Sequence, residues 1–347
     1  MDVMKKIKVL VVEDSYMFRN VLVNGLNADP AIEVVATAGN PFEARDMIIK
    51  HEPDVMTLDV EMPKMDGIEF LRKLMPQHPL PVVMVSSLND KVFDALNAGA
   101  VDFVNKPAGM SKEQLGDFIH NELVTKVKIA STVKLGNFKR AKYEGNMRGT
   151  SVAGDRYSNL VLAIGASTGG TEAICSVLVG LEGRAPGIVI TQHMPPGFTQ
   201  MFAERLNNQT KFNVSEGRTG DIIRPGYVYI APGDKQMKVV KVGGNYQIEC
   251  YNGQRVSGHC PSVDVLFESV ATACEKNAIG VILTGMGADG AKGLYKMRQS
   301  GAITIGQDEE SCIVYGMPKV AKELGGVMYQ AGLKTIPEKI HGLLNKL

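Results

Sequence analysis

The stretch KIKVLVVEDS at residues 6–15 sets the pattern for the first part of the chain. Its apolar run, residues 6–12, is bounded by charged residues and predicts a strand buried within a sheet. Helical periodicity follows from about Tyr16 to Leu26. Strands that alternate with helices predict a parallel sheet covered on both faces. Four further strand runs lie at residues 32–38, 54–60, 81–87 and 101–107, with amphipathic stretches at 41–51, 67–75 and 91–100.

A second alternating series begins at NLVLAIGAS, residues 159–167, after a polar, basic and glycine-containing stretch. Two runs around Gly243-Gly244 predict a β-hairpin. We therefore predict two α/β domains, at residues 1–128 and 158–347, joined by an interdomain linker at 129–157. The second domain is expected to be doubly wound and mainly parallel. Its further strand candidates lie at 187–193, 226–232, 278–285 and 301–307.

The composition is that of an ordinary globular protein. The 347 residues carry a formal net charge of +1, which gives no indication of binding to nucleic acid or to an anionic membrane. The five cysteines form no C-x-x-C pair, which argues against disulfides and thiolate zinc sites. No apolar stretch is long enough to span a bilayer, and the N-terminus has no signal-sequence pattern. We expect a cytoplasmic, monomeric protein without direct membrane insertion.

Polar residues stand at the ends of successive strands in the first domain. Glu13 and Asp14 follow the first strand, and Asp59 ends the third. Ser86 ends the fourth strand and Lys106 the fifth. The carboxyl ends of parallel strands meet at one edge, where the functional residues of such sheets gather. Clustered carboxylates need a positive partner and are hard oxygen ligands, so we predict a Mg²⁺ site here. Solvated or helix-capping acids are the simpler alternative.

Three residues of catalytic type follow strands of the second domain. Ser167 follows the first strand in IGASTGG (164–170), His193 ends the next, and Asp289 follows the strand at 278–285. A serine, a base and an orienting acid at one sheet edge are the parts of a nucleophilic triad, which is defined by geometry and not by chain order. Ser167 could instead cap the following helix. IGASTGG lacks the lysine of a P-loop and so does not predict a nucleotide site.

The stretch LTGMGADG, residues 283–290, admits two interpretations. Its three glycines match the G-x-G-x-x-G fingerprint of dinucleotide-binding turns, and Asp308 lies about twenty residues further on. Against a cofactor stand the charge of Asp289, which would oppose a pyrophosphate at a helix N-terminus, and the late position of the strand in its domain. The alternative is a tight turn that presents Asp289 for catalysis.

The motifs VVEDS, LDVEMPKMDG, VSS and NKP resemble, in order and spacing, the receiver domain of response regulators across residues 6 to about 125. The resemblance implies a flavodoxin-like (βα)5 domain that is phosphorylated on Asp59 by a histidine kinase. It also implies that Mg²⁺ is held by Glu13, Asp14, Asp59 and the backbone carbonyl of Glu61. The residues implied to contact the phosphoryl group are Ser86 and Lys106, and Phe103 is the implied switch aromatic.

The motifs IGASTGG, TQHMP, HCPSVDVLF, LTGMGADG and YGMP resemble the chemotaxis protein-glutamate methylesterase family across roughly residues 158–345. The resemblance implies that Ser167 is the nucleophile, His193 the general base and acid, and Asp289 the orienting carboxylate. The implied substrates are glutamate γ-methyl esters on chemoreceptors, cleaved with release of methanol. The implied phosphodonor is the chemotaxis histidine kinase. Some family members also deamidate glutamine.

The same resemblance places further residues in the esterase pocket, without a cofactor. These are Thr168, His259 and Met286, the last with a backbone N–H that would bind the oxyanion. Cys260 departs from the family pattern, which more usually has arginine at this position. The departure bears on local substrate contacts and not on the three catalytic positions.

Other outputs are compatible with a receiver domain. A DNA-binding output would require a compact, basic helix-turn-helix, whereas residues 158–347 predict a large α/β domain without a basic stripe. A nucleotide-binding output built on residues 283–290 predicts a bound dinucleotide. A purely structural output leaves Ser167 and His193 unexplained. An esterase regulated by phosphorylation of Asp59 accounts for all of these residues.

Overall fold

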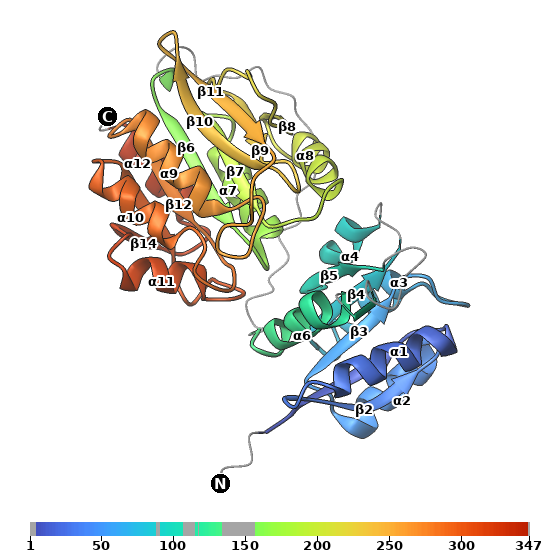
Figure 1. The fold of residues 1–347 in the computed structure, drawn as a ribbon. Helices are drawn as coiled ribbons and strands as arrows, with labels where there is room; N and C mark the ends of the chain where they lie inside the picture. Colours follow the sequence, from blue (N-terminus) through green and yellow to red (C-terminus); the bar gives the residue numbers. More distant parts are fainter. Residues whose placement is uncertain (1–4, 88–90, 107–114, 117, 134–156, 346–347) are drawn as a thin grey trace. The chain divides into compact units, whose positions relative to one another are not determined.

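In a computed structural model the chain divides into two compact units, with the division at residue 140 (Figure 1). The structure describes residues 5–87, 91–106, 115–116, 118–133 and 157–345. Both units are α/β with parallel main sheets, which confirms the predicted fold class. Most of the predicted linker lies outside the described residues, and the two boundaries between the three predicted segments stay a prediction.

The first unit is built on five parallel strands in the order β2-β1-β3-β4-β5. β3 and β4 are buried along their whole length, which explains why their sequences are nearly unbroken apolar runs. The strand order reverses at β1, so the ends of β1 and β3 lie side by side at the edge where such folds bind ligands. The strands are β1 (Ile7–Val12), β2 (Ile32–Ala38), β3 (Val55–Asp59), β4 (Val82–Ser86) and β5 (Asp102–Asn105).

The first four helices of the first unit begin and end close to the predicted positions, whereas the last two, η1 and α6, were not predicted. α2 begins with Pro41 after Asn40, whose side chain accepts hydrogen bonds from the first helical N–H groups. The helices are α1 (Tyr16–Asn27), α2 (Pro41–His51), α3 (Gly67–Leu74), α4 (Val92–Ala98), the π-helical η1 (Phe118–Leu123) and α6 (Val124–Ser131). The last three residues of α6, 129–131, therefore lie within the predicted linker, which was expected to start at residue 129.

The second unit is built on seven parallel strands in the order β14-β13-β12-β6-β7-β9-β8. Here the order reverses at β6, because the chain continues to β7 on one side and returns to β12 on the other. The carboxyl ends of β12, β6 and β7 are therefore neighbours. The strands are β6 (Val161–Ala166), β7 (Gly187–Gln192), β8 (Asn213–Glu216), β9 (Tyr227–Ile230), β12 (Ala278–Ile282), β13 (Ile303–Gln307) and β14 (Tyr329–Ala331).

In the described part of the second unit, a two-stranded hairpin and six helices accompany the main sheet. The hairpin, β10 (Gln236–Val242) and β11 (Asn245–Tyr251), turns at Gly243-Gly244 as predicted, and both glycines have positive φ. It packs against α9, where Val239 donates its N–H to Ser269 Oγ at 2.9 Å. None of the helices within the described residues is long and apolar enough to cross a membrane. The helices are α7 (Gly170–Leu181), α8 (Phe198–Gln209), α9 (Val263–Cys274), α10 (Ala291–Gln299), α11 (Met317–Glu323) and α12 (Ile336–Leu344).

Candidate functional site

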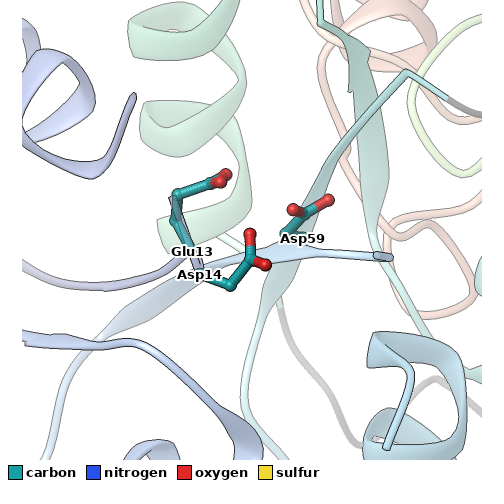
Figure 2. Close-up of side chains that lie close together, drawn as sticks. All are labelled: Glu13, Asp14 and Asp59. Atoms are coloured by element: carbon teal, nitrogen blue, oxygen red, sulfur yellow. The ribbon is translucent and has the colours of Figure 1, made fainter. Parts of the chain in front are cut away.

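The three carboxylates at the edge of the first sheet lie close together. Glu13 and Asp14 follow β1 and Asp59 ends β3, and Figure 2 shows their side chains grouped there. One oxygen of each carboxylate lies within 4.8 Å of the others. Glu13 and Asp59 are buried and Asp14 is exposed, so the group opens to solvent on one side.

Lys106 supplies a counter-charge to this acidic group. Its Nζ lies 2.8 Å from Glu13 Oε2 and 2.7 Å from Asp59 Oδ2. Burial raises the pKa of Glu13 and of Asp59, and Lys106 opposes that effect. Burial acts to lower the pKa of Lys106, but hydrogen bonds to its two carboxylate partners outweigh this and raise it. Lys106 pairs with two of the three carboxylates, so the group keeps excess negative charge, and such a set of hard oxygen donors fits Mg²⁺.

The other predicted residues of the first domain lie around this group. The Glu61 N–H donates to Asp59 Oδ1 at 3.2 Å, so the backbone of Glu61 lies against Asp59. Ser86 is buried at the end of β4, and its carbonyl accepts the Lys106 N–H at 2.8 Å. Phe103 is buried within β5, with Lys126 Nζ 5.0 Å from its ring centroid. Phe103 therefore lies within the strand that precedes Lys106 and is not part of the acidic group itself.

Ser167, His193 and Asp289 all lie at one edge of the second sheet. Ser167 follows β6 and His193 follows β7, and the last residues of these strands, Ala166 and Gln192, are register partners. The His193 N–H donates to the Ala166 carbonyl at 3.2 Å. Asp289 belongs to the loop after β12, the neighbour of β6 on its other side. The placement expected from strand ends alone is the one that the structure has.

Asp289 is held by a full set of hydrogen-bond donors. Its side chain is 1% exposed, and its Oδ2 lies 2.7 Å from His193 Nε2. Oδ2 also accepts from the Val263 N–H at 2.8 Å, and Oδ1 accepts from Ser262 Oγ at 2.7 Å and the Asp264 N–H at 3.0 Å. Burial acts to raise the pKa of Asp289, but the hydrogen bond from His193 and the other donors outweigh it, so the pKa is lowered. The carboxylate thus stays charged at the positive N-terminal end of α9.

The contact with Asp289 determines the tautomer of His193. A carboxylate only accepts, so neutral His193 carries its proton on Nε2 and has its lone pair on Nδ1. Nδ1 is buried and has no hydrogen-bond partner among the residues that the structure describes. The His259 ring stacks on His193 with centroids 3.6 Å apart and planes inclined by 11°. Burial and the neighbouring His193 lower the pKa of His259 to about 4, so His259 is neutral at pH 7 and adds no charge to the base.

Ser167 does not cap a helix. The N-cap of α7 is Gly169, which has positive φ and makes no side-chain hydrogen bond. The hydrogen bonds of Ser167 to other described residues use its backbone, and its hydroxyl is left for chemistry. Gly285 lets the loop after β12 approach this residue, because a Cβ added there would lie 2.7 Å from Ser167 Cβ.

The implied pocket residues Thr168 and Met286 flank Ser167 in different ways. Thr168 is buried, and its carbonyl accepts from Thr284 Oγ1 at 3.0 Å, which ties the loop after β6 to the loop after β12. Met286 follows Gly285, and its side chain is 47% exposed. Across the described part of the chain, the Met286 N–H donates no hydrogen bond, so it is available to an oxyanion.

The geometry of residues 283–290 favours the catalytic interpretation over the dinucleotide fingerprint. Within this loop the Asp289 carboxylate is bound by the first N–H groups of α9, so the loop presents an acid. Gly290 caps α10 in the left-handed conformation, and a Cβ there would lie 2.4 Å from Val263 Cγ1. Asp308, the acid expected of the fingerprint, instead accepts from the N–H and Oγ of Ser311 at 2.9 and 2.6 Å.

Two residues of this edge were not among the sequence candidates. Ser262 caps α9 and donates to Asp289. A serine directly before an apolar helical stretch predicts the cap, but the sequence does not indicate that its hydroxyl donates to Asp289. Gln192 ends β7 and donates from Nε2 to the Ser167 carbonyl at 2.9 Å. A glutamine at a strand end carries no recognisable signal, so only the structure reveals it.

The chain is similar to known proteins over both units. A family model described as CheB methylesterase matches residues 162–340, and one described as response regulator receiver domain matches residues 9–117. The chain is 55% identical over 345 residues to a protein-glutamate methylesterase/protein-glutamine glutaminase 2 of Syntrophomonas wolfei, with 99% of each chain covered. It is 47% identical over 342 residues to the protein-glutamate methylesterase/protein-glutamine glutaminase of Escherichia coli (strain K12), with 97% of each covered.

A solved structure resembles the second unit. The crystal structure of the Thermotoga maritima CheB methylesterase catalytic domain matches with a TM-score of 0.52 and 37% identity, over 53% of this chain and 98% of that one. The family model covers the strands that carry Ser167, His193 and Asp289, and the relatives match along nearly the whole chain. With a receiver domain followed by this catalytic unit, the chain belongs to the CheB methylesterase family.

Proposed function

We propose that this protein hydrolyses glutamate γ-methyl esters on chemoreceptors with Ser167, His193 and Asp289 as its catalytic triad, and that phosphorylation of Asp59 regulates the reaction. The observation that carries the proposal is the way His193 is held. This residue follows the strand next to the one that precedes Ser167. Its Nε2 is bound to a buried carboxylate at 2.7 Å, and its buried Nδ1 has no hydrogen-bond partner among the described residues. An imidazole held in this way can act as a general base, because the lone pair on Nδ1 is available to take a proton.

The reaction follows from these positions. Ser167 Oγ attacks the ester carbonyl while His193 Nδ1 takes the hydroxyl proton, and Asp289 stabilises the imidazolium that forms. The oxyanion accepts a hydrogen bond from the Met286 N–H. His193 then returns the proton to the methoxy oxygen, and methanol leaves an acyl-enzyme on Ser167. A water molecule, deprotonated by His193, hydrolyses this ester to the free glutamate and regenerates Ser167.

The same site supports a second substrate class. A glutamine side chain presents the same carbonyl with a nitrogen leaving group, and His193 would deliver its proton to that nitrogen, which leaves as ammonia in place of methanol. The relatives from S. wolfei and E. coli are named for both activities. We therefore include glutamine deamidation in the proposed function.

Release of methanol tests the esterase proposal. Full-length protein is incubated with receptor membranes whose glutamates carry isotopically labelled methyl esters, and volatile label is counted. We expect catalytic release, and none from receptor that was never methylated. Addition of hydroxylamine should divert the acyl-enzyme to a γ-hydroxamate on the receptor. Absence of methanol release from methylated receptor, with the phosphodonor present, would contradict the proposal.

The receiver site would supply the regulation. Glu13, Asp14, Asp59 and the Glu61 carbonyl would hold Mg²⁺, which offsets negative charge on an incoming phosphoryl group. Lys106, already within 2.7 Å of Asp59, would hold one phosphoryl oxygen, and the Ser86 hydroxyl would contact another. The phosphodonor would be a chemotaxis histidine kinase. Phosphorylation can change the activity only if it favours one arrangement of the protein over another. The residue proposed to change its position between the two arrangements is the buried Phe103.

Replacement of Asp59 with asparagine should abolish regulation without abolishing catalysis. The amide is not a nucleophile toward phosphorus, so transfer of labelled phosphate from the kinase should be lost completely, and methanol release should no longer respond to phosphodonor. Asp46→Asn is the matched control, because Asp46 is exposed and its one partner among the described residues is Arg45, on the surface. Phosphate incorporation into Asp59→Asn equal to that of the control would show that another residue is the acceptor.

A further inference from the structure

Gln192 connects the backbones of the proposed nucleophile and base. It is the last residue of β7 and is 3% exposed. Its Nε2 donates to the Ser167 carbonyl at 2.9 Å and to the His193 carbonyl at 3.3 Å. The last ladder hydrogen bond between β6 and β7 runs from the His193 N–H to Ala166. One side-chain amide therefore continues the pairing of the two strands past the point where the ladder ends.

The start of α7 leaves room for this amide. A Cβ added to Gly170 would lie 2.1 Å from Gln192 Oε1 and 2.6 Å from Ala166 Cβ. The φ of Gly170 is not in the left-handed region, so its backbone does not require glycine. The position requires glycine for space, and the space is occupied by the Gln192 side chain.

We propose that Gln192 is a positioning residue that holds Ser167 and His193 at reacting distance during acylation and deacylation. The inference rests on the proposed function. The Ser167 side chain is on a loop and His193 is at a strand end, so their separation depends on the relative position of two backbones. An amide bound to both carbonyls fixes that separation. Misplacement of reacting groups by about 1 Å costs on the order of 100-fold in rate.

Gln192→Met tests the role, because methionine has a similar length and no N–H donor. We expect kcat for methanol release to fall about 10- to 100-fold with little change in KM, at a temperature well below the unfolding midpoint. Thr191→Val is the matched control. Thr191 is fully buried on the same strand, and its Oγ1 has no hydrogen-bond partner among the described residues, so kcat should stay at the wild-type level.

A second variant, at the start of α7, fills the space that the Gln192 amide occupies. Gly170→Ala should displace Gln192 and lower kcat, and its effect should be much smaller in the Gln192→Met background, because residues that act through one contact are not additive. If Gln192→Met folds poorly, Gly170→Ala alone decides the matter, because a kcat equal to that of Thr191→Val would then overturn the inference. A kcat for Gln192→Met equal to that of Thr191→Val, or fully additive effects in the cycle, would overturn the inference. If Ser167→Ala remains active, the proposed function itself fails, whereas an inactive Ser167→Ala with a fully active Gln192→Met removes only the role of Gln192.

Discussion

Replacement of Ser167 with alanine is expected to reduce kcat for methanol release by at least about 10⁴-fold, because the nucleophile cannot be replaced by a neighbouring group. Residual hydrolysis would come from the oxyanion donor and from substrate binding. The free energy of unfolding should change by less than about 1 kcal/mol, since the described hydrogen bonds of Ser167 use its backbone. Initial rates on methylated receptor and a thermal melt measure the two quantities.

Ser300→Ala is the control for Ser167→Ala. Ser300 is exposed at the end of α10, and within the described part of the chain its hydroxyl donates to the Lys296 carbonyl alone, at 3.0 Å. Its methanol release should equal that of the wild type. If Ser167→Ala released methanol at the rate of Ser300→Ala, hydrolysis would have to proceed without an acyl-enzyme on Ser167. Trapping by hydroxylamine should also disappear in Ser167→Ala, which separates covalent catalysis from direct attack by water.

The sequence predicts the central strands of both sheets well and the edge strands of the second sheet poorly. β3, β4, β6, β7 and β12 are buried along their whole length, so burial on both faces imposes an apolar run that can be read directly. β8 and β14 have four and three residues, too few to establish a pattern, and only β8 has a fully buried residue. Short edge strands are defined by the neighbour that they pair with, which no local pattern records.

The candidate site divides in the same way. Ser167, His193 and Asp289 could be placed at one edge because each follows a recognisable strand, and sheet topology brings strand ends together. The contacts that hold them could not be predicted. His193 and Asp289 are 96 positions apart, and Ser262 and Gln192 reach partners 27 and 25 positions away. Such contacts depend on the angle at which loops leave the sheet, and that angle is set by tertiary packing.

Replacement of Asp289 with asparagine should reduce kcat by about 10³- to 10⁴-fold, because an amide no longer stabilises the tautomer of His193 that accepts the Ser167 proton. The substitution should also lower the free energy of unfolding by about 1–3 kcal/mol. Each carboxylate oxygen accepts from a backbone N–H, Oδ1 from Asp264 and Oδ2 from Val263. A backbone N–H cannot become an acceptor, so the asparagine NH₂ faces a donor in either orientation.

The neighbouring acid provides the control for this prediction. Asp264 is also buried, and burial raises its pKa, yet it accepts one backbone N–H, from Gly293 at 2.8 Å, and one hydroxyl, from Ser257 at 3.2 Å. The hydroxyl can rotate to accept, so Asp264→Asn should keep both contacts, its stability and its kcat.

The pH dependence of stability separates the role of the Asp289 charge from that of its shape. The pKa of Asp289 is lowered in the folded protein, so its charged form stabilises the fold above its unfolded pKa of about 4, and this contribution is lost as the pH falls through the lower folded value. The difference in unfolding free energy between wild type and Asp289→Asn should therefore shrink below about pH 4. Denaturant titrations at pH 7 and at pH values below 4 measure it. A difference that stays constant, together with near-wild-type methanol release by Asp289→Asn, would mean that the carboxylate charge is neither what binds the α9 N–H groups nor what orients His193.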